Sequence, residues 1–519
     1  MSDRKTKTCA ILAILLFTVV ALAGCANKAA NTAATAAGSV LTVAWDGNTV
    51  PNNLAPVDPV KTPWFYSRAG ILETLVDVDF NGKMQPGLAT AWKQNSSGAW
   101  SITLRSGVKF HDGTPMDAKA VKFVLDRLAA NSKVIPIASV DAPSDTEVVI
   151  TTSKPASYVP ALLATPRAVI YAQSSFQDSK FVQPVGTGPY SYVSYDKGTG
   201  VVTCKANDAY WNGKPQIATI INKYIPDNQA RIMALQSGEV DFIRTVSPES
   251  ARMLASNPDF VVASGNIARV RQLVFNTKKA PLDNVAVRQA VNYAIDRKAI
   301  IDSALGGYGQ PAVGFFPPNL PWGDPNLKGY GYDQDKAKAL LDQAGWKDTD
   351  KDGVRDRDGN KLQLLLETYP DHPEMAGIAQ VIQAQLKAVG IKVTIEIKDY
   401  GATENSLKAR AFDMMLMGRG LGNLTPDALF ILNDFTSKPD SVWSPVYSNS
   451  KVDDLLTQAS QVAPDKQQDL YNQVQEIVEQ DAPAAFLNYY VAIDAYKKGL
   501  QGYKIHPTEA HMLTEKLSK

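Results

Sequence analysis

The sequence predicts a mixed α/β protein whose first portion is rich in strands and whose second portion is rich in helices. Three observations support this prediction. Strand-type alternation recurs up to about residue 205, helical apolar stripes recur from about residue 284, and residues 378–397 combine one helix with one strand. At 519 residues the chain is too long for a single hydrophobic core and predicts two or more domains. The sequence contains no internal repeat of the kind that solenoids and propellers require.

The strands of the first portion are predicted from runs of apolar residues and from their alternation with polar ones. Val40 to Trp45 is expected to be a buried opening strand. Trp100, Ile102 and Leu104 alternate with polar neighbours, as the residues of a half-exposed strand do. Near the other end of the chain, the long apolar run Ala484 to Ile493 predicts a further buried strand.

The helices of the second portion are predicted from apolar residues spaced three and four apart. One such stripe lies within residues 287–295, and a second lies within residues 335–344, where Gly345 is expected to end the helix in the left-handed conformation. A third helix occupies the first part of residues 378–397 and is followed by a strand. We also expect one long helix from Val452 to Gln480.

Residues 1–24 have the features of a lipoprotein signal peptide. Three basic side chains precede an uncharged run, Cys9 to Leu22, that is too short to span a bilayer comfortably. The segment ends in Leu22 to Cys25, which matches the lipobox at which diacylglycerol is attached to the thiol before cleavage. We therefore expect Cys25 to be lipidated and to anchor the chain to a membrane through a flexible tether over residues 25–39. The alternative is a secretory signal peptide with a coincidental cysteine.

Charge and cysteine content exclude several classes of partner. Removal of residues 1–24 takes away three basic and one acidic side chain and changes the net charge from +1 to −1. A nearly neutral chain has no long-range field for nucleic acid or anionic lipid, so nucleic acid is not an expected partner. Of the three cysteines, only Cys204 would remain as a free thiol in the processed protein, which excludes an intramolecular disulfide framework.

Six groups of residues, in this order along the chain, carry a resemblance to a known family. They are Leu72–Leu75 with Pro86–Trp92, Leu104–Pro115, Pro184–Tyr190, Asn207–Pro215, Ala234–Asp241, and Phe275–Thr277 with Val287–Ile295. Together they resemble the bacterial extracellular solute-binding proteins of family 5, which serve peptide, nickel and related ABC importers. The resemblance covers nearly the whole chain after the signal peptide.

The resemblance implies a two-lobed periplasmic-binding-protein fold, class II-like, in which lobe rotation encloses the ligand. The expected parts are lobe I at 40–277 with a strand-rich subdomain at about 76–205, lobe II at 278–485, a return to lobe I at 486–519, and crossing strands near Val270–Thr277 and Phe486–Asp494. The implied partners are a small-molecule solute and an ABC permease and ATPase complex. The protein is then a monomer on the extracytoplasmic side of the cell membrane, facing a periplasm or the outer cell surface.

Neither a catalytic motif nor a cofactor is predicted. The signatures of zinc proteases, serine hydrolases and nucleotide-binding loops are absent from the sequence, which indicates a protein that is not an enzyme. His506 and His511 form a loose cluster that we expect to be a surface feature without a metal.

One acidic turn resembles the start of an EF-hand loop and is a weak calcium candidate. Its carboxylates are Asp348, Asp350, Asp352 and Asp356. The twelfth position is Gly359 rather than glutamate, so the bidentate ligand of an EF-hand is missing. An acidic connection between a helix and a strand is the structural alternative.

The identity of the solute is the least determined feature. Peptide-binding relatives hold the ligand ammonium with an aspartate a few residues ahead of a proline, and here Gly422 stands at that position before Pro426. The nickel-binding branch uses an arginine after a proline to pair with a chelator carboxylate, which makes Arg167 the first candidate for a ligand contact. That branch's tryptophan and tyrosine are replaced by Gly420 and Leu424, so neither pocket is reproduced intact.

The remaining ligand-binding candidates are polar residues of the 418–426 segment and aromatic residues in irregular stretches. They are Arg419, Asn423, Trp64, Phe65, Tyr66, Tyr369, Trp443 and Tyr447. For Arg167 an ordinary ion pair is the alternative role, and for each aromatic residue it is core packing. The sequence thus predicts a receptor for a short peptide or a peptide-like, carboxylate-bearing solute. A nickel-chelate receptor is the near alternative, and a peptide-binding sensor or chaperone without transport is the alternative from another class.

Overall fold

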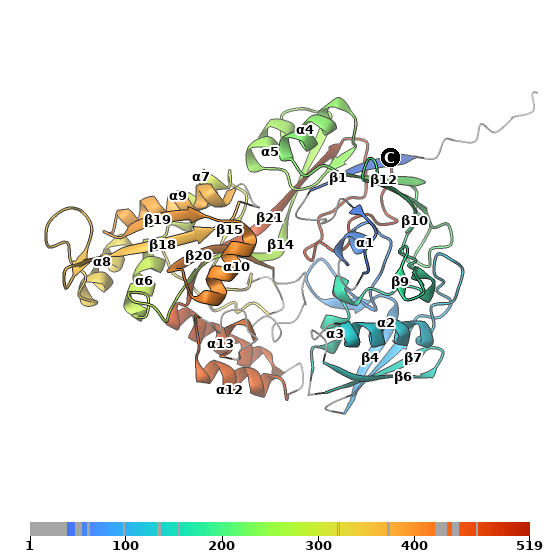
Figure 1. Ribbon diagram of the computed structural model, residues 1–519, viewed down its shortest axis with the longest axis horizontal. Helices are drawn as coiled ribbons and strands as arrows, with labels where there is room; N and C mark the ends of the chain where they lie inside the picture. The colour runs from blue at the N-terminus through green and yellow to red at the C-terminus, as the bar shows by residue number, and fades with distance from the viewer. Residues whose placement is uncertain are drawn as a thin grey trace, which may run out of the picture. The chain divides into compact units, whose positions relative to one another are not determined.

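The main feature of the fold is a mixed sheet of eleven strands, seen in a computed structural model (Figure 1). The structure describes residues 39–46, 54–59, 63–96, 99–131, 136–153, 156–318, 320, 322–370, 374–420, 433–437, 446–462 and 466–519. The candidates Cys25, Asn423 and Trp443 lie outside these residues. Within the described residues, no helix combines the length and the apolar character that a membrane crossing needs.

The sheet joins strands that are far apart in the sequence. Ten strands follow one another in the order β10-β11-β12-β1-β13-β21-β14-β20-β18-β19, and β15 pairs with β21 off this path. Their bounds are β10 Tyr190–Asp196, β11 Val201–Ala206, β12 Thr219–Tyr224, β1 Val40–Trp45, β13 Phe242–Ile243, β21 Ala484–Lys497, β14 Phe260–Phe275, β20 Met414–Gly420, β18 Gln363–Thr368, β19 Lys392–Ile397 and β15 Gln310–Pro311. β1 is parallel to β12 and β13, and β18 is parallel to β19 and β20.

Two long antiparallel strands, β14 and β21, lie in the middle of this order and connect its two parallel groups. The later half of β21 pairs with β13, for example at Tyr496 and Phe242. The later half of β14 pairs with β20, from Arg269 opposite Gly420 to Phe275 opposite Met414. Figure 1 shows β14 and β21 side by side between the remaining strands. The expected strand at Ala484–Ile493 is therefore present and extends four residues further.

A separate antiparallel sheet of four strands lies in the first portion, in the order β4-β5-β7-β6. The bounds are β4 Ala89–Ser96, β5 Ala99–Leu104, β7 Glu147–Thr152 and β6 Ile137–Ser144. Helix α2, Ala118–Asn131, packs on β6 and β7. The hairpin β10–β11, although inside the expected subdomain range, pairs with β12 of the main sheet. Two short hairpins complete this portion, β2 Val76–Val78 with β3 Met84–Pro86, and β8 Phe176–Gln177 with β9 Lys180–Phe181.

The helices of the second portion pack around β18, β19 and β20. They are α6 Val285–Ala294, α7 Arg297–Ala304, α8 Gln334–Gln343, α9 Glu374–Lys387 and α10 Tyr400–Ala409. Asp333 caps α8, and Gly345 follows the helix with a φ of 85°, as the sequence predicted. The apolar faces of α6, α7, α8 and α9 contribute to the second of three core clusters, which includes Val287, Leu341 and Ile382.

The expected single helix over Val452–Gln480 is wrong, because the structure has two helices there. They are α12, Ser450–Ala459, and α13, Gln468–Asp481. Asn449 caps the first helix through its side-chain oxygen. The sequence places Pro464 between the two helices, and proline removes a backbone donor and clashes with the preceding turn of a helix.

The short helices α1, Trp64–Arg68, and α3, Val159–Leu162, belong to the first portion. Helices α4, Asn228–Ser237, and α5, Pro248–Ala255, follow β12 and β13. Side chains of α4 and α5 form the third core cluster with Ala44 of β1 and Ala495 of β21. The two helices therefore cover the sheet beside the strands that connect its two parts.

Candidate ligand-binding cavity

A cavity of about 670 Å³ opens where strands from both parallel groups end. Asp46 follows β1, Arg244 follows β13 and Tyr369 follows β18, and all three line the cavity together with Gly418 and Gly420 of β20. Ligands of open α/β sheets bind beyond the carboxyl ends of the strands, because the connecting loops leave a crevice there. This position makes the cavity the candidate functional site.

Helix starts also face the cavity. Asn228 at the start of α4, Pro248 at the start of α5 and Glu374 at the start of α9 are among its lining residues. The side chains of Asp227 and Ser247 cap α4 and α5 by accepting hydrogen bonds from backbone N–H groups.

The lining carries as many cationic as anionic side chains. The cationic side chains are Arg68, Arg231, Arg244, Arg269 and Arg271. The anionic side chains are Asp46, Asp227, Glu374, Asp494 and Glu509. The formal charge of the lining is therefore zero. Most of these groups are buried, and buried charges are stable only when they are paired and hydrogen-bonded.

Glu509 is the centre of the largest ionic network. Its Oε1 lies 3.0 Å from Nη2 of Arg244, and its Oε2 lies 2.8 Å from Nε of Arg269. Burial alone would raise the pKa of Glu509, but Arg269, Arg244 and Arg68 together lower it to about 2. The carboxylate of Glu509 is thus held ionised by the guanidinium groups around it.

Asp494 extends the same network on the crossing strand β21. It lies 3.8 Å from Nε of Arg244, accepts a 2.5 Å hydrogen bond from the hydroxyl of Tyr503 and accepts another from the backbone N–H of Thr245. Burial raises the pKa of Asp494, and the nearby Arg244 offsets only part of this effect.

A second ionic pair, Arg271 with Glu374, connects the crossing strand β14 to the start of α9. The guanidinium of Arg271 also lies 3.6 Å from the ring centroid of Tyr490, a cation–π contact. Gly418 is required beside this stack, because a Cβ atom there would lie 2.4 Å from the hydroxyl oxygen of Tyr490. The backbone N–H of Gly418 donates to the hydroxyl of Tyr369, which lines the cavity as a ligand candidate.

Arg419 lies between Gly418 and Gly420, so its side chain points to the other face of β20. Both Nε and Nη2 of Arg419 lie 2.6 Å from Asp434 Oδ2. Arg167 lies in a 3-10 turn, Pro166–Ala168. Burial and the like charge of Arg419 lower the pKa of Arg167. Among the described residues no carboxylate pairs with Arg167, and neither Arg167 nor Arg419 lines the cavity.

Most of the aromatic candidates lie in the core. The ring of Phe65 packs edge-on against Trp45 at 5.5 Å, and the hydroxyl of Tyr66 contacts the backbone of Val57. Trp64 lies beside Arg68, whose guanidinium is 5.5 Å from the Trp64 ring centroid. Tyr447 is also buried, and its hydroxyl donates to Asp481. None of these four residues lines the cavity described above.

The sequence interpretation named none of the charged residues of the cavity as candidates. A signal existed for two of them, because Arg269 and Arg271 are two residues apart, and residues at this spacing share one face of a regular strand. Arg68, Arg244 and Glu509 come from distant segments that share no local pattern. Their grouping depends on the tertiary fold.

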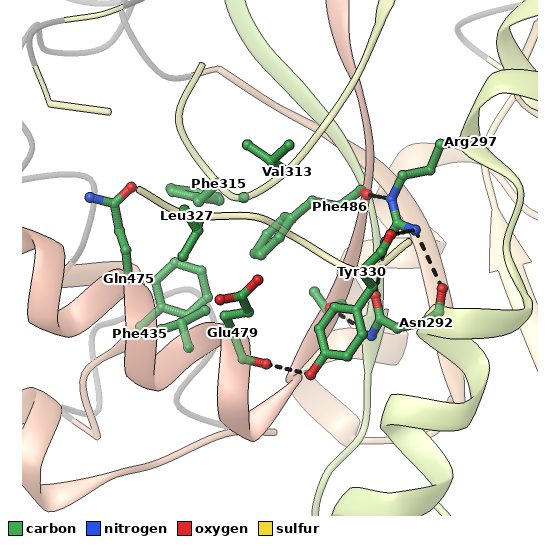
Figure 2. Close-up of a pocket in the computed structure, with 13 residues that line it drawn as sticks. Asn292, Arg297, Val313, Phe315, Leu327, Tyr330, Phe435, Gln475, Glu479 and Phe486 are labelled. Atoms are coloured by element: carbon green, nitrogen blue, oxygen red, sulfur yellow. Dashed lines mark hydrogen bonds between the residues drawn. The ribbon is translucent and has the colours of Figure 1, made fainter. Parts of the chain in front are cut away.

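A second cavity lies inside the second portion and has only about 10 Å³ of free space, enough for at most about one water molecule (Figure 2). Phe315, Phe435 and Phe486 lie around it. Arg297 donates from Nε to the backbone carbonyl of Phe486, and the hydroxyl of Tyr330 donates to the carbonyl of Glu479. This cavity is a packing defect between hydrogen-bonded core residues and is too small for a solute.

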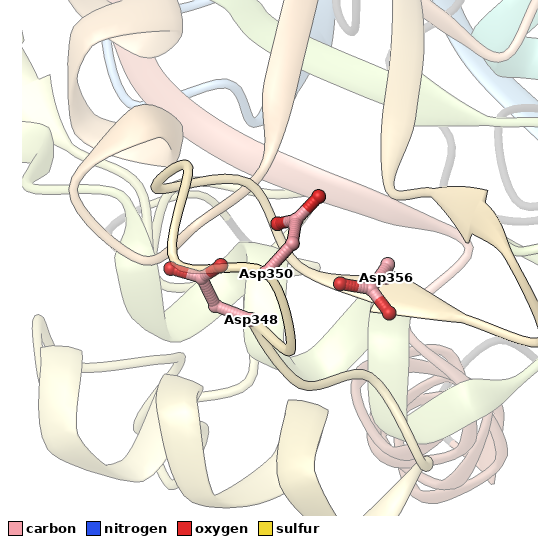
Figure 3. A group of neighbouring side chains, drawn as sticks. All are labelled: Asp348, Asp350 and Asp356. Carbon is pink, nitrogen blue, oxygen red and sulfur yellow. The ribbon is translucent and has the colours of Figure 1, made fainter.

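The acidic turn around Asp348–Asp356, here called the acidic loop, already contains a cation. Figure 3 shows the side chains of Asp348, Asp350 and Asp356. The ammonium of Lys361 lies 2.6 Å from Asp350 Oδ1 and 2.9 Å from Asp352 Oδ1, and these carboxylates raise the pKa of Lys361. A protein ammonium thus pairs with two of the carboxylates that calcium would need.

The histidine cluster is not a surface feature, contrary to the expectation from the sequence. His506 is buried, with Nε2 2.8 Å from the carbonyl oxygen of Val78 and Nδ1 2.8 Å from the hydroxyl of Thr508. His511 pairs with Asp77 at 2.8 Å. Both rings hold the C-terminal segment against β2.

The fold and the cavity between two parallel groups of strands define a two-lobed periplasmic binding protein. Residues 83–441 match the bacterial extracellular solute-binding proteins, family 5 middle region. The chain belongs to this family of transport proteins, whose members are extracytoplasmic and bind small solutes for ABC importers.

Individual relatives cover most of the chain. The nickel-binding periplasmic protein of Escherichia coli K12 is 32% identical over 78% of each chain, and the oligopeptide-binding protein AppA of Bacillus subtilis is 29% identical over 98% of this chain and 97% of its own. Among solved structures, NikA from Brucella suis with Fe(III)-EDTA is similar with a TM-score of 0.84 at 25% identity, covering 92% of this chain and 99% of that one. AppA from Bacillus subtilis with a nonapeptide is similar with a TM-score of 0.73 at 26% identity, covering 92% and 98%.

Proposed function

We propose that this protein is the receptor of an ABC importer for a short peptide or a peptide-like, carboxylate-bearing solute. The observation that carries the proposal is the cavity lined by equal numbers of cationic and anionic side chains. A peptide has an ammonium and a carboxylate that both lose water on binding, and each needs a partner of opposite charge. A lining with both charges meets that need.

The size of the cavity supports the same class of ligand. Its volume of about 670 Å³ lies within the range of about 300–1,000 Å³ that small-molecule sites occupy. Aromatic groups accompany the charges, since Tyr308, Tyr369 and Tyr490 line the cavity. The oligopeptide-binding relative AppA makes a peptide a chemically reasonable ligand for this chain.

A nickel chelate is the second candidate, and the similarity to the nickel-binding periplasmic protein of Escherichia coli supports it. Arg167 has no carboxylate partner among the described residues and lies near the charge of Arg419, so an incoming carboxylate would relieve the repulsion. Both a chelator and a peptide can supply that carboxylate. None of His111, His506 and His511, the histidines within the described residues, lines the cavity, which favours the peptide.

The proposal assigns a separate role to each part of the chain. Lobe I at 40–277 with 486–519 and lobe II at 278–485 would close on the solute by bending of β14 and β21. Residues 1–24 would direct export, and lipid on Cys25 would hold the protein, as a monomer, at the membrane beside its permease and ATPase. The role is binding and delivery without bond chemistry.

Native mass spectrometry and thermal shift test the class of solute. The purified protein would be screened with di- to pentapeptides, free nickel, and nickel with histidine. Stabilisation by peptides alone supports the main proposal, and stabilisation only by nickel with histidine would replace it with the chelate function. Loss of peptide uptake in a deletion strain separates a transport receptor from a peptide-binding sensor or chaperone, which would leave uptake unchanged.

A substitution tests the proposed carboxylate anchor. Arg167 does not line the cavity, and the proposal is that closure of the lobes brings it to the carboxylate of the solute. Arg167→Ala should then weaken binding of the stabilising solute by about 2–5 kcal/mol, because it removes the charge partner of a desolvated carboxylate. Isothermal titration calorimetry measures the change, and Arg252→Ala on the exposed side of α5 is the matched control. Unchanged affinity with an unchanged melting temperature would show that Arg167 is not the anchor.

A further inference from the structure

Arg269 lies at an irregularity of the crossing strand β14. The pairing of β14 with β21 shifts between Asn266 and Val270, where four steps along β14 match only two along β21. The backbone N–H of Ala268 inside this bulge donates to the carbonyl of Pro507, which ties the bulge to the C-terminal segment. Bulges turn side chains out of the regular alternation of a strand and often do so beside binding sites.

Arg269 is the accessible arginine of the cavity. Its side chain is 26% exposed, whereas those of Arg244 and Arg271 are 4% and 6% exposed, and Arg68 and Arg231 are buried. The register adds to this difference, because Gly420 stands opposite Arg269 on β20 and offers no side chain to cover it. A solute in the cavity therefore reaches Arg269 more readily than the other guanidinium groups.

Arg269 also has N–H donors that Glu509 does not contact. A guanidinium has five N–H donors. Glu509 lies near Nε of Arg269 and is the one carboxylate that pairs with it among the described residues. Arg231, by contrast, donates to four backbone carbonyls, and Arg271 pairs with Glu374 and stacks on a tyrosine ring.

Glu509 orients the side chain of Arg269 but contacts only its Nε atom. The carboxylate of Glu509 also pairs with Arg244 and lies near Arg68. Three guanidinium groups therefore surround this one carboxylate. The contact at Nε fixes the stem of Arg269 and leaves the two terminal nitrogens for another acceptor. Two parallel N–H groups of a guanidinium match the two oxygens of a carboxylate.

We infer that Arg269 binds an acidic group of the solute in addition to the terminal carboxylate, so that the receptor prefers peptides or peptide-like solutes with an acidic side chain. This inference rests on the proposed function. Arg269 acts as a specificity-determining residue, and Glu509 is its positioning residue.

The test compares matched peptides on matched variants. The protein is purified in detergent from cells that express the full chain, and isothermal titration calorimetry measures the binding of Ala-Ala-Glu, Ala-Ala-Gln and Ala-Ala-Ala. Wild type should bind the glutamate peptide about tenfold or more tightly than the glutamine peptide, as expected for a hydrogen-bonded charge. Arg269→Gln should lose this preference and keep the affinity for Ala-Ala-Gln, while Arg252→Gln should behave as wild type.

The outcomes separate this inference from the proposed function. Equal affinity of wild type for Ala-Ala-Glu and Ala-Ala-Gln, or an undiminished preference in Arg269→Gln, would overturn the inference and leave a peptide receptor. Absence of binding for all three peptides would overturn the proposed function and the inference with it. The affinity of Arg269→Gln for Ala-Ala-Gln and its melting temperature serve as the controls for folding.

Discussion

Glu509→Gln should destabilise the protein at neutral pH, and the loss should shrink as the pH falls. In the folded protein the pKa of Glu509 is about 2, against an ordinary value of 4.5, because Arg269, Arg244 and Arg68 outweigh the effect of burial. This difference corresponds to about 3 kcal/mol of unfolding free energy. Loss of one partner of a buried ion pair costs about 3–5 kcal/mol, which agrees in size.

The sign of the pH dependence follows from the lowered pKa. A carboxylate with a lowered pKa stabilises the folded state fully above its ordinary pKa, and the contribution is lost as the pH falls from 4.5 towards 2. Glutamine lacks this contribution at every pH. The difference between wild type and Glu509→Gln should therefore be largest at pH 7 and about two fifths as large at pH 3.

Urea denaturation followed by tryptophan fluorescence, at pH 7, 5, 4 and 3, measures the difference. Glu404→Gln is the control, since Glu404 is exposed and its helical ion pair with Lys408, at 3.8 Å, should contribute less than about 0.5 kcal/mol. A Glu509→Gln protein that unfolds within about 0.5 kcal/mol of wild type at pH 7 would refute the reasoning. A difference that stays constant from pH 7 to pH 3 would refute the part that assigns it to ionisation.

Three further predictions concern packing, reactivity and metal binding. Gly418→Ala should lower the unfolding free energy in urea by about 1–3 kcal/mol, because its Cβ would lie 2.4 Å from the hydroxyl oxygen of Tyr490. Tyr490→Phe should recover part of this loss, and Gly331→Ala, whose Cβ would meet nothing within 4 Å, should be nearly neutral. Cys204 should resist iodoacetamide at pH 8 until the protein is unfolded, since burial raises its pKa to about 12, and equal labelling of the folded protein would contradict this. Millimolar calcium should leave the melting temperature of wild type unchanged, because the ammonium of Lys361 already pairs with Asp350 and Asp352 of the acidic loop, and a calcium-dependent rise would contradict that assignment.

Much of the secondary structure was predictable because interactions between residues that are close in the sequence determine it. The alternation of Trp100, Ile102 and Leu104 predicted β5, and the glycine at 345 predicted the end of α8. The expected single helix over Val452–Gln480 is wrong because helical apolar periodicity continues on both sides of Pro464, although the structure has two helices there. A proline between two compatible patterns was the stronger local signal.

The candidate site was less predictable, because large rings suit a core and a cleft equally well. Phe65 and Tyr447 stand in stretches that showed no helical or strand period, yet both are buried among other side chains. Arg167, expected from the resemblance to the nickel-binding branch, does not line the cavity, and its contact with the solute stays a prediction. The charged residues of the cavity were missed, since residues as distant as Arg68 and Glu509 meet only after folding.

The crossing strand β14 shows why the charges gather at this place in the fold. Val270 and Val274 belong to the largest core cluster, whereas Leu273 and Phe275 belong to the second, so the strand passes between two apolar cores. Arg271 lies within this passage, where its charge is met by Glu374 rather than by apolar packing. Because β14 lies between the two apolar cores, an ion pair on this strand does not replace apolar side chains inside either core. The same junction is where a solute must be held if the lobes are to close on it, and the cost of burying charge there is then met in part by contacts to the solute.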